Sequence, residues 1–143
     1  MIFVASNIMI KDIVTKKVKV VREDTTLHEI IATLSNFNIN SLIVMQGHKP
    51  VGIITTKDAL TRGFEHGMPV SAITAKIVAS SPLTTIDEEA SVEEAAALMK
   101  RSKIKHLPVV NEGKLVGILT DSDIMFAVPS MLSTMEAVCR PQK

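Results

Sequence analysis

Two stretches of this chain are nearly identical: VGIITTKDAL at 51–60 and VGILTDSDIM at 116–125. Their glycines, Gly52 and Gly117, stand 65 residues apart, and one gapless offset of 65 also aligns the sequence upstream, back to about residue 8. Self-similarity at a fixed period indicates that one structural unit occurs more than once along the chain. The sequence therefore predicts a duplicated fold, and this constrains its architecture more than any other feature.

The duplication predicts one unit at 8–66, a second at 73–130, and an amphipathic tail at 131–143. In each unit a short extended stretch precedes apolar residues at helical spacing, then two short apolar runs typical of a hairpin, then a second helix. The fold class is therefore α+β, with the order β-α-β-β-α in each unit. Because one such unit has a very small core, we expect the two to pack sheet to sheet about a pseudo-twofold axis.

Four predicted helices begin with a hydroxyl residue that is followed three positions later by an acid. The pairs are Thr26 with Glu29, Thr55 with Asp58, Ser91 with Glu94 and Thr120 with Asp123. This spacing is typical of a capping box, in which both side chains bind free amides of the first helical turn.

The second helix of each unit also fits a ligand-binding interpretation. Helix N-termini attract phosphate, a threonine hydroxyl can bind a phosphate oxygen, and a carboxylate can accept bonds from both hydroxyls of a ribose. A glycine on the preceding strand would let a base or ribose approach the backbone. Capping alone and ligand binding are both open at Asp58 and Asp123.

Composition excludes several function classes. The chain has 16 Lys and Arg against 15 Asp and Glu, a net charge of +1. This balance does not favour binding to nucleic acid. Apolar residues make up 46% of the chain and the mean hydropathy is +0.28, yet no apolar run approaches the roughly 20 residues that span a bilayer. So much apolar surface in a small chain indicates self-association.

Cysteine and histidine usage indicates a cytoplasmic protein without a metal site. A single cysteine, Cys139, forms no internal disulfide and suits a reducing compartment. The four histidines lie at no metal-binding spacing, and no C-x-x-C is present. No catalytic set of residues appears either, so we expect neither an enzyme nor a required cofactor. The apolar start of the chain lacks a basic region before it and is interpreted as mature structure.

The duplicated β-α-β-β-α unit, closed each time by Gly-apolar-apolar-Thr-x-x-Asp, resembles the cystathionine-β-synthase (CBS) domain. The stretch KIKHLPVVNEGKLVGILTDSDI at 103–124 is typical of that family. The resemblance covers almost the whole chain and implies a tandem CBS pair, or Bateman module. Such modules bind adenosine-containing ligands (AMP, ADP, ATP or S-adenosylmethionine) between their units and regulate a partner protein. Two modules commonly pair into a disc of four units, which implies a homodimer.

The resemblance also implies the residues of two clefts, each drawing on both units. The cleft of Asp123 is expected to contain Ile118, Thr120, Ser122, Val14, Thr15, Lys17, Lys19 and the backbone of Asn40 and Ser41. The cleft of Asp58 is expected to contain Ile53, Thr55, Lys57, Ala79, Ser80, Pro82, Leu83, Thr84 and the strand at Ile104 and Lys105. Lys57, Lys105 and His106 are the candidate cations for phosphate.

The two units differ where the family pattern is strongest. The second unit has His106 and Pro108 where the first has Ser41 and Ile43, so the clefts need not bind equally or prefer one ligand. Two other functions stay open: a dimerisation or scaffold module without a ligand, and the sensor portion of a transcriptional regulator.

Overall fold

A computed structural model describes residues 8–127, and these form two compact units. One unit is Val18–Thr84, and the other combines the described parts of Met1–Lys17 and Thr85–Lys143. Each is a mixed α+β unit with one three-stranded sheet, which confirms the predicted fold class. The predicted tail at 131–143, with Cys139, lies outside the described residues.

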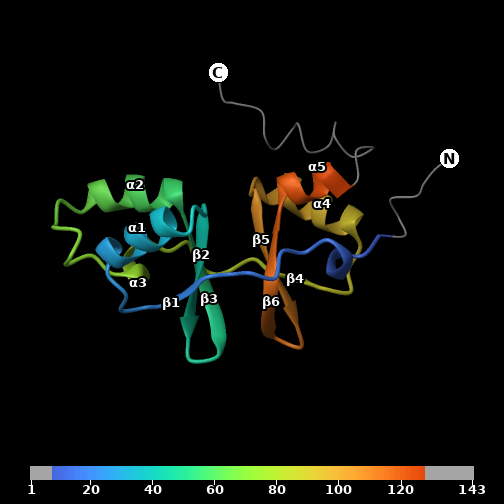
Figure 1. Cartoon of the computed structure of the whole chain (residues 1–143), viewed down its shortest axis with the longest axis horizontal. Coiled ribbons are helices and arrows are strands. Elements are labelled where there is room, and N and C mark those ends of the chain that lie inside the picture. The colour runs from blue at the N-terminus through green and yellow to red at the C-terminus, as the bar shows by residue number, and fades with distance from the viewer. Residues whose placement is uncertain (1–7, 128–143) are drawn as a thin grey trace, which may run out of the picture. The chain divides into compact units, whose positions relative to one another are not determined.

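The unit Val18–Thr84 contains three strands and three helices. In chain order they are β1 (Val20–Arg22), α1 (Leu27–Asn36), β2 (Ser41–Gln46), β3 (Lys49–Thr55), α2 (Thr56–Glu65) and the short α3 (Ala75–Val78). Strand β2 is central, parallel to β1 and antiparallel to β3. Figure 1 shows α1 and α2 beside the β2–β3 hairpin. The core of the unit Val18–Thr84 consists of Leu27, Ile30, Leu34, Leu42, Val44, Ile54, Ala59, Ile73, Ala75 and Val78.

The other unit repeats this plan. Its elements are a 3-10 turn η2 (Ile10–Asp12), β4 (Ile86–Asp87), α4 (Val92–Ser102), β5 (His106–Asn111), β6 (Lys114–Thr120) and α5 (Asp121–Ala127). Strand β5 is central, parallel to β4 and antiparallel to β6. Helices α4 and α5 lie beside the β5–β6 hairpin (Figure 1). Its core consists of Ile10, Val92, Ala95, Ala96, Met99, Leu107, Val109, Leu119 and Ile124.

The first helix of each unit begins at the predicted cap, but only half of each predicted box forms. Thr26 Oγ1 accepts from the Glu29 amide at 3.2 Å, and Ser91 Oγ accepts from the Glu94 amide at 3.1 Å. In neither helix does the glutamate return a bond to the cap residue. In each helix the amide of the first residue donates to a backbone carbonyl that is distant in sequence. The Leu27 amide donates to the Ile73 carbonyl at 2.7 Å, and the Val92 amide donates to the Ile8 carbonyl at 3.1 Å.

The first residues of each repeat, 8–15 and 73–80, form its leading segment. Each leading segment packs on the core of the other repeat. Thr15 and Ile118 exchange two backbone hydrogen bonds of 3.1 and 2.9 Å, and Ser80 and Ile53 do the same at 2.9 and 3.2 Å. These two pairings are related by the same offset of 65 residues that relates the sequences. Each compact unit is therefore completed by a segment that the sequence repeat assigns to the other copy.

Side chains help to hold both leading segments. Lys11 Nζ lies 2.8 Å from Glu89 Oε1, and this hydrogen bond raises the pKa of Lys11 above its ordinary value. Because the pair is exposed, it adds little stability. In the other unit, Arg62 Nη1 donates to the carbonyls of Ala79 at 2.8 Å and Val78 at 3.2 Å, at the end of α3.

Within residues 8–127, none of the helices is long and apolar enough to cross a bilayer.

Candidate functional site

Both Thr-x-x-Asp sequences form complete capping boxes at the junction of a strand and a helix. The Thr120 amide donates to Asp123 Oδ2 at 2.9 Å, and the Asp123 amide donates to Thr120 Oγ1 at 3.2 Å. Thr55 and Asp58 make the same pair of bonds, at 3.0 and 3.2 Å. The capping interpretation is therefore confirmed at both positions.

The cap uses only one oxygen of each carboxylate. Asp58 and Asp123 use Oδ2 for the cap, and in the described part of the chain no hydrogen bond reaches Oδ1 of either residue. Both side chains are half-buried. Because a carboxylate offers two acceptor oxygens, the same residue can start the helix and accept a hydrogen bond from a ligand.

The leading segment of the first repeat lies directly beside Asp123. Thr15 Oγ1 is 3.5 Å from Asp123 Oδ2, and the Thr15 backbone pairs with Ile118 on β6. In the other unit Ser80 pairs with Ile53, but no hydrogen bond joins its hydroxyl to Asp58. Each unit thus places its acid next to a segment from the start of the other repeat.

The glycines of the repeated pattern have a different role from the one predicted. A Cβ built on Gly117 would lie 2.5 Å from the Thr15 carbonyl oxygen and 2.7 Å from Val14 Cγ2. A Cβ built on Gly52 would lie 3.2 Å from both Ala79 Cβ and the Ser80 carbonyl oxygen. The leading segments occupy the space that we expected a base or ribose to use.

The start of β5 brings Lys105 and His106 to the first turn of α5. The carbonyl of Lys105 accepts from the Asp121 amide at 3.1 Å, and His106 lies opposite Thr120 in the hairpin register. Both residues therefore border the first turn of α5, which contains Asp123, whereas the resemblance implied that Lys105 belongs to the cleft of Asp58. The first turn of α5 also contains Asp121, so this side of the unit holds two aspartates beside one lysine and one histidine.

The equivalent positions in the other unit are neutral. The Asn40 carbonyl accepts from the Thr56 amide at 3.0 Å, and Ser41 lies opposite Thr55. The exposed Lys57, in the first turn of α2, is the predicted cation on this side. The two sites share their backbone geometry but differ in charge.

None of the remaining predicted residues that the structure describes makes a hydrogen bond to Asp58 or Asp123. Lys19 places Nζ 3.9 Å from the centroid of the Phe37 ring, a cation–π contact on its own unit. Ser122 is an exposed residue of the first turn of α5. The others lie outside helices and strands: Lys17, Pro82, Leu83 and Thr84, of which only Leu83 is half-buried. Within residues 8–127, no three His, Cys, Asp or Glu side chains gather as a metal site would require.

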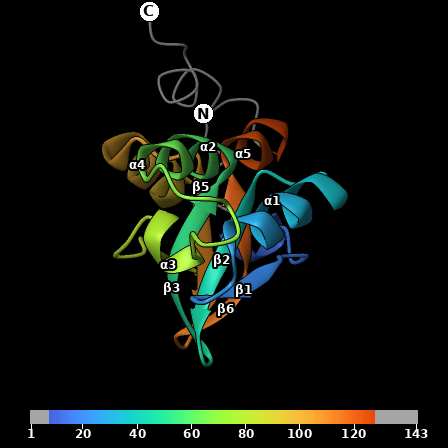
Figure 2. The ribbon, with the colours of Figure 1, turned by 90° about the vertical axis from the view of Figure 1, so that its left-hand side faces the viewer.

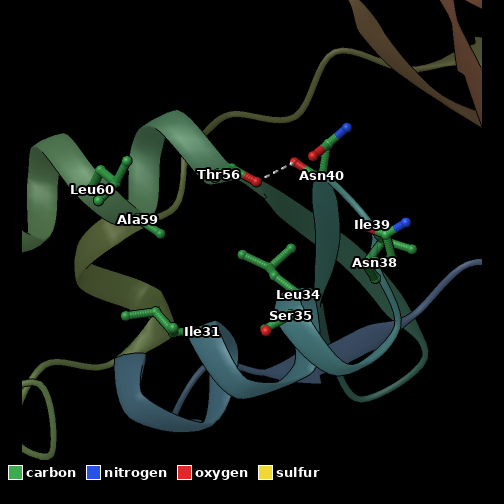
Figure 3. A pocket seen from close by; sticks show the side chains of 9 residues that line it. All are labelled: Ile31, Leu34, Ser35, Asn38, Ile39, Asn40, Thr56, Ala59 and Leu60. Carbon is green, nitrogen blue, oxygen red and sulfur yellow. Dashed lines mark hydrogen bonds between the residues drawn. The ribbon is translucent and has the colours of Figure 1, made fainter.

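A pocket that the sequence did not predict opens between α1 and α2. It has a volume of about 320 Å³ and is lined by Ile31, Leu34, Ser35, Asn38, Ile39, Asn40, Thr56, Ala59 and Leu60. Figure 3 shows Leu34 and Ala59 pointing into this space, with the hydrogen bond from Thr56 to Asn40 at one end. The sequence signal for it is Ala59, a small residue at the position where the second repeat has Ile124.

Two small α+β units, each with a capped Thr-x-x-Asp where its last strand meets its last main helix, define a tandem-repeat protein. The family model described as CBS domain matches residues 10–65 and 70–130. The chain therefore belongs to the CBS domain family and contains two copies of the domain.

Similar proteins support this assignment. The uncharacterized protein MK0525 of Methanopyrus kandleri is 33% identical over 113 residues, which are 78% of this chain and 58% of that protein. The crystal structure of an uncharacterized conserved protein from Pyrococcus horikoshii is 30% identical, with a TM-score of 0.78 over 85% of this chain and 92% of that one. Hypoxic response protein 1 of Mycobacterium tuberculosis is 28% identical over 134 residues, 92% of this chain and 94% of that protein. A crystal structure of Hypoxic Response Protein I contains two coordinated zinc ions and has a TM-score of 0.76.

Proposed function

We propose that the chain is a regulatory module that binds an adenosine-containing ligand of the AMP, ADP, ATP or S-adenosylmethionine class. The observation that carries this proposal is the carboxylate of Asp123. Its cap bonds hold it beside Thr15, and in the described part of the chain its Oδ1 accepts no hydrogen bond. Its Oδ1 can accept a hydrogen bond from a ribose hydroxyl without loss of the cap. Asp58 offers the same arrangement in the other unit.

Lys105 and His106 are the proposed phosphate-binding groups at the Asp123 site. Lys105 and His106 border this site, and the helix that contains Asp123 directs its N-terminus toward it. Charge-assisted hydrogen bonds from such groups to phosphate are about twice as strong as neutral ones. The Asp58 site has Asn40 and Ser41 at the positions of Lys105 and His106, and Lys57 in the first turn of its helix, so the two sites need not prefer the same ligand.

The proposed output is regulation of a partner protein, not catalysis, and the proposed compartment is the cytoplasm. A ligand that binds one conformation of the module better than another shifts the population toward it, and a partner can read that shift. The leading segments are suited to this role, because each lies at a site and belongs to the other repeat in sequence.

We also propose that the chain forms a homodimer. Large apolar side chains lie on the surface of helices in the described residues, among them Leu60 and Phe64 on α2. Small monomeric proteins rarely expose contiguous apolar patches without a binding role.

Thermal unfolding with and without AMP, ATP and S-adenosylmethionine tests the ligand proposal. A ligand at 100 times its dissociation constant adds about 2.7 kcal/mol to the free energy of unfolding, so the melting temperature should rise by several degrees. Guanosine monophosphate serves as the control for a general effect of nucleotides. If no adenosine compound raises the melting temperature, the ligand-free scaffold function replaces this proposal.

A further inference from the structure

The pocket between α1 and α2 has a buried apolar floor and an exposed rim. Leu34 and Ala59 form the floor and are 7% and 6% exposed, whereas Ile31 and Leu60 at the rim are 43% and 57% exposed. Figure 2 looks onto these two helices of the unit Val18–Thr84. Because the rim is exposed, a small molecule can enter the pocket from solvent.

The pocket is lined entirely by uncharged residues. Its polar side chains belong to Ser35, Asn38, Asn40 and Thr56, and Figure 3 shows Asn38 and Asn40 at the end away from Leu60. The Thr56 hydroxyl donates to the Asn40 carbonyl at 3.4 Å. The side chains of Ser35, Asn38 and Asn40 make no hydrogen bond to any other residue that the structure describes. Their donors and acceptors are available to a ligand at the rim.

The second repeat has larger or charged residues at the same positions. The offset of 65 places Ile124 where the first repeat has Ala59, and Ile124 is fully buried in its own core. The backbone of the turn after the first helix is alike in both repeats, since φ is 51° at Asn38 and 56° at Lys103. The polar rim positions Ser35, Asn38 and Asn40 correspond to Lys100, Lys103 and Lys105. The neutral pocket is therefore a property of the side chains of the first repeat, not of the fold.

We propose that this pocket binds a small uncharged molecule with an apolar body and one hydrogen-bonding group, such as a primary amide. The body packs on Leu34 and Ala59, and the polar group meets Ser35 and Asn38 at the rim. The volume of about 320 Å³ is near the lower end of the roughly 300–1,000 Å³ of small-molecule pockets, so the ligand is about the size of a substituted ring.

The same lining excludes charged ligands. No lining residue offers an opposite charge, and burying an unpaired charge against Leu34 and Ala59 is unfavourable. Thr55 and Asp58 do not line the pocket, so this site is separate from the strand–helix junctions and does not depend on nucleotide binding.

An NMR titration of the full chain with 4-methylbenzamide, without nucleotide, tests the site. The amide resonances of Ile31, Ala59 and Leu60 should move, with a dissociation constant of about 1 mM or tighter. The matched compound is 4-methylbenzoate, which has nearly the same shape and a negative charge, and it should bind about tenfold more weakly or worse. Absence of saturable binding, equal binding of the carboxylate, or shifts confined to the neighbourhood of Asp58 would overturn the proposal.

Ala59→Ile is the direct test of the pocket, because it introduces the residue that the second repeat has in a packed core. The added atoms occupy the space above the floor, so the affinity for 4-methylbenzamide should fall about tenfold or more. Ala97→Ile makes the same change at an exposed position of α4 and should leave the affinity unchanged. Undiminished binding in Ala59→Ile would refute the site.

Ser35→Lys supplies a test that leaves the floor intact. Ser35 is exposed in the last turn of α1, where a lysine is favourable for the helix. The new cation should improve the affinity for 4-methylbenzoate relative to 4-methylbenzamide by about threefold or more. An unchanged ratio would contradict the placement of the polar group at this rim. Since these measurements contain no nucleotide, their outcome and that of the thermal shift with AMP are independent.

Discussion

Replacing Gly117 by alanine should destabilise the protein by about 2–3 kcal/mol, the upper part of the roughly 1–3 kcal/mol typical when a packed core is forced to accept extra atoms. The added Cβ would lie 2.5 Å from the Thr15 carbonyl oxygen, which is backbone and cannot rotate away. The segment at Val14 and Thr15 would have to move off β6, and its two hydrogen bonds to Ile118 would break. Urea unfolding followed by circular dichroism measures the loss.

The same substitution at Gly52 is the matched control. Its Cβ would meet Ala79 Cβ and the Ser80 carbonyl oxygen at 3.2 Å, a distance that a shift of a few tenths of an ångström relieves. We expect Gly52→Ala to cost less than about 1 kcal/mol, as mild repacking usually does. Equal losses for the two variants, or a larger loss for Gly52→Ala, would contradict the account of the leading segments.

Replacing Asp123 by asparagine should weaken AMP binding by about 10- to 100-fold. Asparagine keeps one carbonyl oxygen, which can still accept the Thr120 amide at the cap. It loses the charge and the second acceptor oxygen, and a hydrogen bond to a charged group is worth about 1.5–3 kcal/mol. Isothermal titration calorimetry measures the change in affinity, and the unfolding curve without AMP shows whether the cap survives.

Two variants make this result specific. Asp24→Asn alters an exposed aspartate of the other unit, whose Oδ1 accepts from Arg22 Nε at 3.1 Å, and it should leave affinity unchanged. Asp58→Asn removes the same charge and acceptor oxygen in the other unit, and it should leave the binding of AMP beside Asp123 in place. A wild-type affinity in Asp123→Asn would refute the role of this carboxylate.

The main elements of both units could be predicted because local signals agree with the tertiary structure there. Apolar spacing in 27–34 and 92–99 matches α1 and α4, and the Gly-containing turns match both hairpins. The Thr-x-x-Asp helix starts were also predictable, because the cap bonds join residues only three positions apart. Local chemistry was sufficient for each of these features.

Features that depend on distant residues were not predictable. The repeat alone does not show that the segment at 8–15 completes the core around β6, since that pairing spans about a hundred residues. The role of Gly117 was therefore misassigned to a ligand, although the need for a small residue was recognised. The short η2 and α3 carry too few residues for a periodic signal, and the pocket depends on how Ala59 packs between two helices.

An NMR titration of the backbone amides with AMP tests whether AMP binds at the strand–helix junction beside Asp123. We predict that AMP moves the amide resonances of Thr15, Thr120 and Asp123, while those of Ile31 and Leu60, which line the pocket between α1 and α2, change little. A titration that leaves the first group unmoved, or moves only the second, would contradict it.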